Sequence, residues 1–310
     1  MPYVSLAELA AVAAERGLTI GAVVREDEAA ATETPEAELN ARMARNLQVM
    51  REAVARGRAG LRSRSGLTGG DARKMAEAGA AAGEPGTSTS RPRLVGGEPL
   101  DTAIALALAV SEVNAAMGRI VAAPTAGSAG VIPAVILTVG ERVGATDEQL
   151  IDALFTAGGV GQVIAAKATL SGAEGGCQAE CGSAGAMAAA AAVQLAGGTP
   201  GQCLDAAAIA LKGSLGLVCD PVAGLVEVPC IKRNGLSAAV ALAAADMALA
   251  GIRSVIPADE VIAAMGEVGR ALPASLRETS QGGLAATPTG KRLAARLFGG
   301  TPGADGTRQG

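Results

Sequence analysis

The residues most able to carry chemistry in this sequence are its cysteines. The chain has 310 residues and no histidine, and its five cysteines all lie between residues 175 and 233: Cys177, Cys181, Cys203, Cys219 and Cys230. Without histidine, the chain cannot form a Ser-His-Asp or Cys-His catalytic group, or a zinc site that combines cysteine with histidine. Thiolates bind soft metals and iron–sulfur clusters. The first hypothesis is therefore a metal site built from thiolates.

The sequence around each cysteine separates three candidate ligands from the other two. Cys177 follows two glycines, Cys219 precedes Asp-Pro and Cys230 follows a proline, so we expect these three in breaks of the chain, where thiolates can converge. Cys203 lies in an apolar helical segment and is expected in the core, since free cysteine behaves as a small hydrophobe. Cys181 comes four residues after Cys177 and could face the same way on a helix. Its role stays open.

Three thiolates would suit a cubane iron–sulfur cluster in which one iron remains open. Iron–sulfur clusters are held by cysteine thiolates, usually four of them, so a set of three leaves one iron free for substrate. An open iron is a Lewis acid, which can bind a substrate hydroxyl and make it a better leaving group.

Two glycine-rich turns could bind the carboxylate of a substrate through their backbone N–H groups. One turn, residues 68–70, precedes a helical segment, and the other, residues 125–128, interrupts an apolar stretch between two prolines. A plain helix cap and a kinked core helix are the respective alternatives. Arg277 could add a bidentate charge partner, unless it pairs with a neighbouring acid. The substrate-binding candidates are Thr68, Gly69, Gly70, Thr125, Gly127, Ser128 and Arg277.

Three other motifs are incomplete. Residues 287–292 resemble a phosphate-binding loop, but position 285 lacks the glycine, and Arg292 replaces the Ser or Thr that binds Mg²⁺. Residues 159–161 lack the third glycine and the preceding strand of a dinucleotide site. Pyridoxal phosphate needs a lysine beside a phosphate-binding cup, and neither Lys167 nor Lys212 has one.

The composition predicts an all-α fold that must position these residues. With one Tyr, two Phe and no Trp, the core must be built from Ala, Val, Leu, Ile and Met. Alanine is the best helix former, whereas the 43 glycines break or kink helices. Capping residues predict helix starts at Ser5, Thr146 and Thr199. We expect an Ala/Gly-rich helical domain with broken helices and glycine-rich turns around the cysteines, and two helices within residues 5–60.

Charge and hydropathy argue against a nucleic-acid or membrane partner. The net charge of −4 does not suit a nucleic-acid surface, which needs clustered Lys and Arg. The apolar stretch at residues 120–139 is interrupted by prolines and glycines, and the stretch at residues 236–252 is short and contains Asp246. Neither is therefore expected to span a membrane. The amino terminus lacks the pattern of a secretory signal, so we expect a cytoplasmic protein. Five cysteines, an odd number, would make a poor disulfide framework, and a reducing compartment favours their use in metal binding or catalysis.

In the motifs around the cysteines and the glycine-rich turns, the sequence resembles the α subunit of iron–sulfur-dependent L-serine dehydratases, also called L-serine ammonia-lyases. The resemblance extends from about Ser65 to Arg296 and rests on motifs at residues 65–71, 123–135, 176–180, 219–230 and 277–285. It implies an all-helical fold, conversion of L-serine to pyruvate and ammonia, and a [4Fe–4S] cluster held by Cys177, Cys219 and Cys230. One departure is Cys181, where family members more often have an apolar residue.

The resemblance also implies a division of the chain and a partner. We expect N-terminal helices at residues 1–60, a helical catalytic domain of the serine dehydratase α type at 61–298 and a disordered tail at 299–310. A small β portion is implied as a separate subunit, and we expect an oligomer. The proton-abstracting base is not identified by sequence, but Ser128, Lys74 and Glu180 are candidates by residue type.

Two other functions remain open from sequence alone. One is a related cluster-dependent lyase that acts on another small amino or hydroxy acid, which substrate profiling would reveal. The other is a thiolate-based iron–sulfur sensor, which would show no turnover. The glycine-rich turns near the cysteines favour an enzyme, because a sensor has no need of a substrate pocket.

Overall fold

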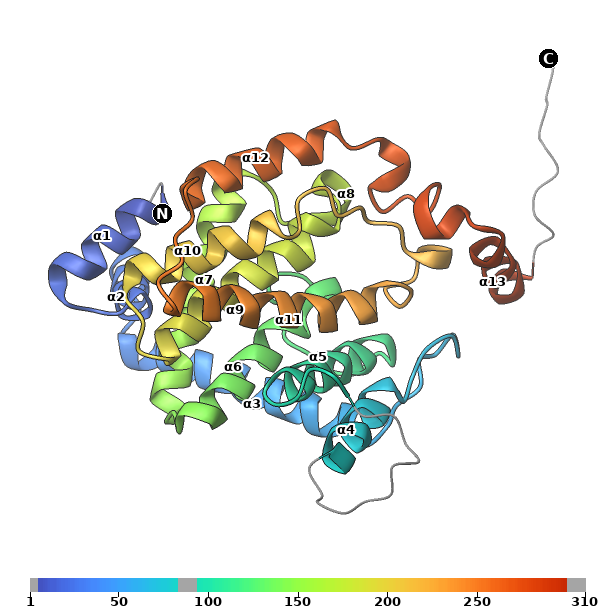
Figure 1. The fold of residues 1–310 in the computed structure, drawn as a ribbon, viewed down its shortest axis with the longest axis horizontal. Helices are drawn as coiled ribbons and strands as arrows, with labels where there is room; N and C mark the ends of the chain where they lie inside the picture. The colour runs from blue at the N-terminus through green and yellow to red at the C-terminus, as the bar shows by residue number, and fades with distance from the viewer. Residues whose placement is uncertain (1–4, 83–93, 300–310) are drawn as a thin grey trace.

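The computed structural model describes residues 5–82 and 94–299, and these residues form helices and connecting segments without a β-strand. The predicted all-α class is confirmed (Figure 1). In chain order the α-helices are α1 (Leu6–Arg16), α2 (Ile20–Thr32), α3 (Glu36–Arg58), α4 (Asp71–Ala82), α5 (Leu100–Ala115), α6 (Val131–Val143), α7 (Asp147–Lys167), α8 (Gly172–Gly175), α9 (Ser183–Leu195), α10 (Pro200–Lys212), α11 (Cys230–Leu249), α12 (Ala258–Ala271) and α13 (Pro288–Phe298).

Five short helical turns lie between these helices. Four are 3₁₀ turns and η2 is a π-helical turn: η1 (Ala126–Ser128), η2 (Gln178–Gly182), η3 (Val222–Gly224), η4 (Ala274–Leu276) and η5 (Gly283–Ala286). π-Helical turns are rare and occur frequently at functional sites. Most of the tail predicted at residues 299–310, and residues 83–93, lie outside the described part of the chain.

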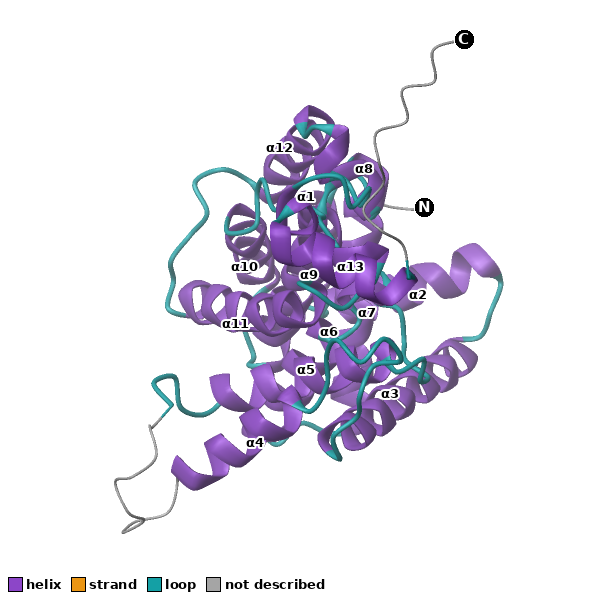
Figure 2. Ribbon diagram, turned by 90° about the vertical axis from the view of Figure 1, so that its right-hand side faces the viewer, coloured by secondary structure: helices purple, strands orange, loops and turns teal. Residues whose placement is uncertain are grey.

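Helix α9 lies at the centre of the fold, between α7, α10 and α11 (Figures 1 and 2). Residues 183–193 of this helix are all buried, and most of them are alanine or glycine. Small side chains let neighbouring helices approach α9 closely, so the core packs without aromatic residues. The main contacts of helix α13 are with η3 and η5, and the helix projects from the main body in Figure 1.

The N-terminal part contains three helices, so the expectation of two is wrong. Gly17 ends α1 in a left-handed conformation, with φ of 62°, and the Thr19 side chain caps the start of α2 by accepting from the Ala22 N–H. The acidic, Ala-rich residues 26–32 therefore belong to the second half of α2 and do not form a connecting loop. The caps predicted at Ser5, Thr146 and Thr199 are confirmed, because each side chain accepts from the backbone N–H three residues later.

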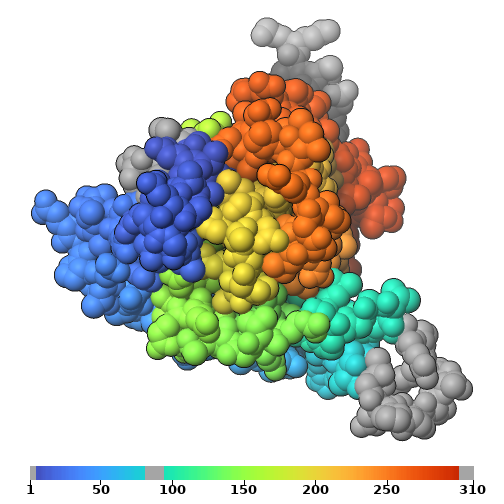
Figure 3. Space-filling model, turned by 60° about the vertical axis from the view of Figure 1, so that its left-hand side comes forward, coloured from blue at the N-terminus to red at the C-terminus, as the bar shows by residue number. Residues whose placement is uncertain are grey.

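Helices α1 to α3 pack on the same hydrophobic core as the central helices. Helix α1 lies on the surface against α10 and α12 (Figure 3). The Asp259 side chain, from α12, accepts hydrogen bonds from the Leu6 and Ala7 N–H groups at 2.9 and 3.0 Å. The same carboxylate forms an ion pair with Lys167 at 3.0 Å.

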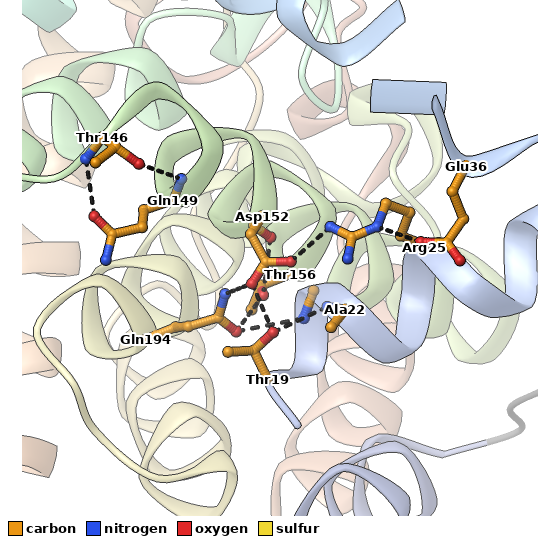
Figure 4. Close-up of polar contacts among 10 residues, drawn as sticks. Thr19, Ala22, Arg25, Glu36, Thr146, Gln149, Asp152, Thr156 and Gln194 are labelled. Atoms are coloured by element: carbon orange, nitrogen blue, oxygen red, sulfur yellow. Dashed lines mark hydrogen bonds and ion pairs between the residues drawn. The ribbon is translucent and has the colours of Figure 1, made fainter. Parts of the chain in front are cut away.

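Asp152 of α7 joins α2 to the central helices through a set of polar contacts (Figure 4). Its carboxylate accepts from Thr19 Oγ1 at 2.6 Å, from Arg25 Nη1 at 3.0 Å and from Gln194 Nε2 at 2.9 Å. Gln194 belongs to α9, so this one carboxylate connects three helices.

Replacing Asp152 with alanine is expected to lower the free energy of unfolding by about 2–4 kcal/mol, because it removes the acceptor of Gln194 Nε2 and one of the two carboxylates that pair with the partly buried Arg25. The control is Asp147→Ala on the same helix, whose exposed ion pair with Arg51 should contribute about 1 kcal/mol or less. Urea unfolding of both variants measures the difference. Equal losses would show that Asp152 does not hold α2 on the core.

Two segments, Ala126–Val143 and Asp147–Lys167, are long and apolar enough to cross a membrane by length and composition alone. About two thirds of each lies inside the protein, with 67% and 61% of the respective windows buried. Core helices of globular proteins give the same signal, so these segments are weak evidence for a membrane span.

Candidate thiolate site

The three cysteines expected in chain breaks do lie in breaks. Cys177 follows Gly176, whose φ of 76° ends α8, and it precedes the π-helical turn η2. Cys219 lies in an extended segment whose backbone pairs with residues 276–278: its N–H donates to Leu276 O at 2.9 Å. Cys230 is the first residue of α11. Irregular backbone at all three positions allows side chains distant in sequence to meet.

Cys177, Cys181 and Cys219 form one buried cluster of thiols, which we call the thiol cluster. They are 3%, 1% and 4% exposed, and Cys230 is 9% exposed. Cys203 lies in α10 and belongs to the main hydrophobic core, as predicted. The structure thus places the ambiguous Cys181 beside two of the predicted ligands, Cys177 and Cys219, while Cys230 lies outside this cluster and Cys203 lies in the main core.

The pKa values of the buried thiols are shifted in different directions by their surroundings. The pKa of Cys177 is lowered, chiefly by a hydrogen bond from Cys181, and the charge of Arg233 also favours its thiolate. Burial raises the pKa of Cys219 well above its usual range and that of Cys230 to about 12. Neighbouring negative groups raise both further. These groups require a positive centre to be held as thiolates, and binding a metal would release their protons.

Glu180 is the carboxylate next to the thiol cluster. It lies in η2, and its Oε2 is 3.8 Å from Cys219 Sγ. Its Oε1 accepts a hydrogen bond from Thr125 Oγ1 at 2.7 Å. Burial raises the pKa of this carboxyl group, and the nearby charge of Glu278 raises it further, while the hydrogen bond from Thr125 lowers it.

Glycine is required at the start of α8 because the thiol cluster and Glu180 lie against it. A Cβ atom on Gly172 would lie 2.5 Å from Glu180 Oε2 and 3.2 Å from Cys219 Sγ. The first distance is shorter than real Cβ contacts allow, so any larger residue would displace the carboxylate. The first turn of α8 is therefore fitted closely to this site.

The turn at residues 125–128 lies beside Glu180. Thr125 and Ser128 cap η1 reciprocally, with their hydroxyl oxygens 3.2 Å apart. Asn234 of α11 holds this region from behind, accepting from the Gly130 N–H at 2.9 Å and donating to Gly127 O at 2.7 Å. The same amide donates to Cys230 O at 3.0 Å. Asn234 therefore fixes the turn relative to the start of α11.

The turn at residues 68–70 is occupied by the chain's own carboxylates. Thr68 Oγ1 donates to Glu227 Oε2 at 2.9 Å. The N–H groups of Asp71 and Ala72, at the start of α4, point to Glu112 Oε1 at 2.6 and 3.4 Å. Gly69 and Gly70 have φ of 139° and 77°, values that favour glycine. This region binds carboxylates, as its geometry predicts, but the carboxylates are the side chains of Glu227 and Glu112 of the same chain.

Glu112 makes a testable contribution to the pH dependence of stability. Burial raises its pKa, and one carboxylate oxygen, Oε2, has no partner among the described residues. The Glu112 carboxyl group therefore binds a proton more tightly in the folded protein than in the unfolded chain. Ionised Glu112 lowers the free energy of unfolding at neutral pH, and this loss disappears as the pH falls through the pKa of the folded protein.

Glu112→Gln removes that titration. Its stability relative to the parent protein is expected to be highest near pH 8 and to decrease as pH falls toward about 4, measured by thermal unfolding across that range. The exposed change Glu141→Gln controls for the substitution itself. A difference between Glu112→Gln and the parent that does not vary with pH would contradict the expected proton uptake.

The side chains of two predicted residues make their polar contacts outside the thiol cluster. Lys74 is exposed on α4, with Nζ 3.0 Å from Asp71 Oδ1. The Arg277 backbone pairs with Cys219, but its guanidinium lines a neighbouring cavity, where Nη1 lies 3.5 Å from Glu174 O. The expected alternative for Arg277, an ion pair with an acid, is absent among the described residues.

Sequence reasoning missed Arg233 and Asn234. The Arg233 side chain is 14% exposed, and its Nη1 lies 2.8 Å from both Asp220 Oδ1 and Val218 O. It provides a positive charge near Cys177. Arg233 and Asn234 follow Cys230 by three and four residues, one helical turn, and that spacing was the available signal.

The residues present fit an iron–sulfur cluster better than a single ion. In the described part of the chain, no three Cys, Asp or Glu side chains are arranged to hold one metal ion. A single ion needs its ligands around one point, whereas each cysteine of an iron–sulfur cluster binds a different iron, so the ligands lie farther apart. Buried thiols from three chain breaks, without histidine or exposed carboxylates among them, are donors of the kind that such clusters use.

The fold and the site define an all-helical protein with a buried, thiol-rich centre beside a carboxylate. A family model described as the serine dehydratase alpha chain matches residues 15–285, and the chain belongs to this family. It is 53% identical over 296 residues to the probable L-serine dehydratase alpha chain of Bacillus subtilis, covering 96% of this chain and 95% of that one.

Two further relatives differ in length. The L-serine dehydratase alpha chain of Peptoniphilus asaccharolyticus is 43% identical over 286 residues, covering 92% of this chain and 95% of the relative. The L-serine dehydratase of Streptomyces coelicolor is 40% identical over 290 residues, which cover 92% of this chain but 61% of that protein. The latter thus contains a substantial portion without a counterpart in the alignment.

Proposed function

We propose that this protein is the α chain of an L-serine ammonia-lyase that forms pyruvate and ammonia. The relatives at 43–53% identity are named L-serine dehydratase alpha chains and align over nearly their whole length. One observation in the structure carries the proposal: Cys219 Sγ lies 3.8 Å from Glu180 Oε2, so a thiol and a carboxylate meet in one partly buried site. Dehydration needs both activation of a hydroxyl and removal of a proton, and this pairing suits both tasks.

Cys177, Cys219 and Cys230 are the proposed ligands of a [4Fe–4S] cluster. Cys181 donates its S–H toward Cys177 and is therefore assigned to support that ligand. Arg233 supplies positive charge on the same side, which favours thiolates. When bound, such a cluster would supply a Lewis-acidic iron for the substrate hydroxyl.

Glu180 is the proposed proton acceptor. Among the described residues, it is the only one of the three candidates with a hydrogen-bonding contact to a thiol, since Ser128 bonds to Thr125 and Lys74 to Asp71. Thr125 orients the carboxylate by donating to one oxygen, which leaves the other directed toward Cys219. Loss of the Cα proton and of the hydroxyl releases water and gives aminoacrylate, which tautomerises to an imine and hydrolyses to pyruvate and ammonia.

The turn at residues 125–128 is the proposed wall of the substrate site. It contacts Glu180 directly, and Gly127 has little free space: a Cβ there would lie 3.1 Å from Glu180 Oε1. A residue larger than glycine would therefore push the carboxylate away. The turn at residues 68–70 supports this region from the outside, because Thr68 binds Glu227, three residues before Cys230.

A separate β chain is the proposed partner. The closely related proteins are named alpha chains, and longer L-serine dehydratases such as that of Streptomyces coelicolor are covered over only 61% of their length. A small second chain would supply what the longer proteins contain in one polypeptide. We also propose a cytoplasmic, oligomeric enzyme, in keeping with free buried cysteines.

An anaerobic assay tests the function. The α chain, with and without the candidate β chain, is purified without oxygen and supplied with L-serine, while pyruvate and the broad iron–sulfur absorbance are measured. Pyruvate formation by coloured protein is the expected result. A colourless protein with bound zinc would refute the cluster, and coloured protein that converts L-cysteine or a hydroxy acid but not L-serine would refute the substrate.

A further inference from the structure

A cavity of about 440 Å³ lies next to the thiol cluster but contains none of its thiols. Its walls come from the end of α7, from α8, from the end of α12 and from the η4 segment. In Figure 1, α8 lies beside α12, which agrees with the contacts between these helices. The volume is within the range of sites that bind small molecules, roughly 300–1,000 Å³.

Two guanidinium groups line this cavity without an ion-pair partner among the described residues. They belong to Arg270, in the last turn of α12, and to Arg277. Arg277 Nε is buried and has no hydrogen-bond partner, and Nη1 makes only a long contact of 3.5 Å with a backbone oxygen. Among the described residues the guanidinium therefore makes no short hydrogen bond, and its Nη groups are the donors that an acceptor in the cavity would bind.

The shape and donor pattern of guanidinium favour a carboxylate as that acceptor. Arginine offers parallel N–H groups that bind both oxygens of a carboxylate, and two arginines can hold one from two sides. The same cavity is lined by Glu174, whose Oε2 is fixed by Thr169 Oγ1 at 2.5 Å. Glu174 thus adds a carboxylate to the wall that holds the two arginines, and a carboxylate is suited to bind an ammonium group.

We propose that Arg270, Arg277 and Glu174 form a binding site for an α-amino acid, with the arginines on its carboxylate and Glu174 on its ammonium group. This proposal rests on the proposed function only in the choice of ligand, because L-serine is the substrate of the proposed reaction. The site is linked to the thiol cluster by two short connections. Helix α8 begins at Gly172, against Cys219, and reaches Glu174 two residues later, while the Arg277 backbone pairs with Cys219.

Calorimetric titration of the metal-free protein with L-serine tests the site. Arg270→Gln and Arg277→Gln are each expected to weaken binding by about tenfold or more, because each removes a charge-assisted hydrogen-bonding pair. Arg277→Gln preserves the backbone pairing with Cys219. The matched control is Arg253→Gln, an exposed arginine outside the cavity, which should bind like the parent.

Glu174→Gln tests recognition of the ammonium group. It should weaken binding of L-serine while leaving binding of glycerate, which has a hydroxyl in place of the ammonium, unchanged. Thermal unfolding confirms that each variant is folded. The site would be overturned if Arg270→Gln, Arg277→Gln and Arg253→Gln bound L-serine with equal affinity. It would also be overturned if Glu174→Gln weakened the binding of glycerate as much as the binding of L-serine.

The test of this binding site can fail or succeed independently of the test of the proposed reaction. Turnover is measured on the cluster-loaded protein, whereas binding is measured on the metal-free protein. Binding of L-serine that depends on both arginines, in a protein that makes no pyruvate, would refute the reaction and support the site. Pyruvate formation by a protein whose L-serine affinity is insensitive to both arginines would refute the site alone.

Discussion

Cys219→Ser is expected to abolish pyruvate formation from L-serine and to remove the iron–sulfur absorbance. Serine is nearly the same size as cysteine but supplies an alkoxide-type oxygen, which is a poor ligand for iron–sulfur clusters. Cys219 is 4% exposed and belongs to the thiol cluster, so no surface residue can take its place without rearrangement. Anaerobic reconstitution, followed by absorbance and a pyruvate assay, measures both effects.

Cys203→Ser is the matched control because it makes the same change at another buried cysteine. Cys203 lies in the main core, and burial raises its pKa to about 12. Its replacement should lower stability by about 1–3 kcal/mol, since a hydroxyl is buried in an apolar environment, but turnover should persist. Similar loss of cluster in both variants would refute the ligand assignment. Retention of cluster by Cys219→Ser would do the same.

Cys181→Ser distinguishes a ligand from a supporting residue. In the proposed arrangement this variant keeps its cluster, whereas Cys177→Ser, Cys219→Ser and Cys230→Ser lose theirs. Because Cys181 is 1% exposed and adjacent to Cys177, it could exchange with that ligand if Cys177 were replaced. Residual cluster in Cys177→Ser that disappears in the Cys177→Ser/Cys181→Ser double variant would show such exchange.

Local sequence was sufficient to predict the fold class, the chain breaks at Cys177, Cys219 and Cys230, and the core position of Cys203. Helix starts at Ser5, Thr146 and Thr199 depend on contacts three residues away, which a short window contains. The breaks at Cys177, Cys219 and Cys230 follow from adjacent glycine and proline, whose effects are also local. Cys203 was assigned to the core from the apolar residues of its own helix.

What the sequence could not show depends on partners far along the chain. The turn at residues 68–70 has donors for a carboxylate, but only the fold reveals that Glu112 and Glu227 occupy them, at separations of 41 and 159 residues. Similarly, Arg277 follows a proline-bounded turn like many exposed arginines, and its place beside Arg270 depends on how α12 ends. Such contacts are set by tertiary packing rather than by local propensity.

The site also shows why Glu180 could not be chosen over the other two bases from sequence. Glutamate, serine and lysine are all plausible proton acceptors by type, and their reactivity depends on surroundings. The structure distinguishes them by position: Lys74 is 76% exposed and paired with Asp71, whereas Glu180 lies against Cys219. Residue type defined the set of candidates, and the contact with Cys219 supports the proposal of Glu180.

Glu180→Gln is accordingly expected to reduce kcat by about 10²- to 10⁴-fold while the iron–sulfur absorbance remains. Glutamine keeps the size of the side chain and an oxygen that can accept from Thr125 Oγ1, so the turn at residues 125–128 should stay in place. It cannot take up a proton at the pH of the assay. The loss should therefore lie in proton abstraction and not in assembly of the site.

A substrate isotope effect separates these possibilities. With L-serine deuterated at Cα, the residual turnover of Glu180→Gln should show a larger isotope effect than the parent, because proton abstraction becomes the slowest step. The control is Glu267→Gln, an exposed residue on α12, which should retain parental turnover. Full activity in Glu180→Gln, or loss in Lys74→Gln alone, would show that the proton leaves by another route. Loss of absorbance together with activity would instead make Glu180 a residue that maintains the cluster site, because its contact with Cys219 Sγ would then be needed to position that ligand.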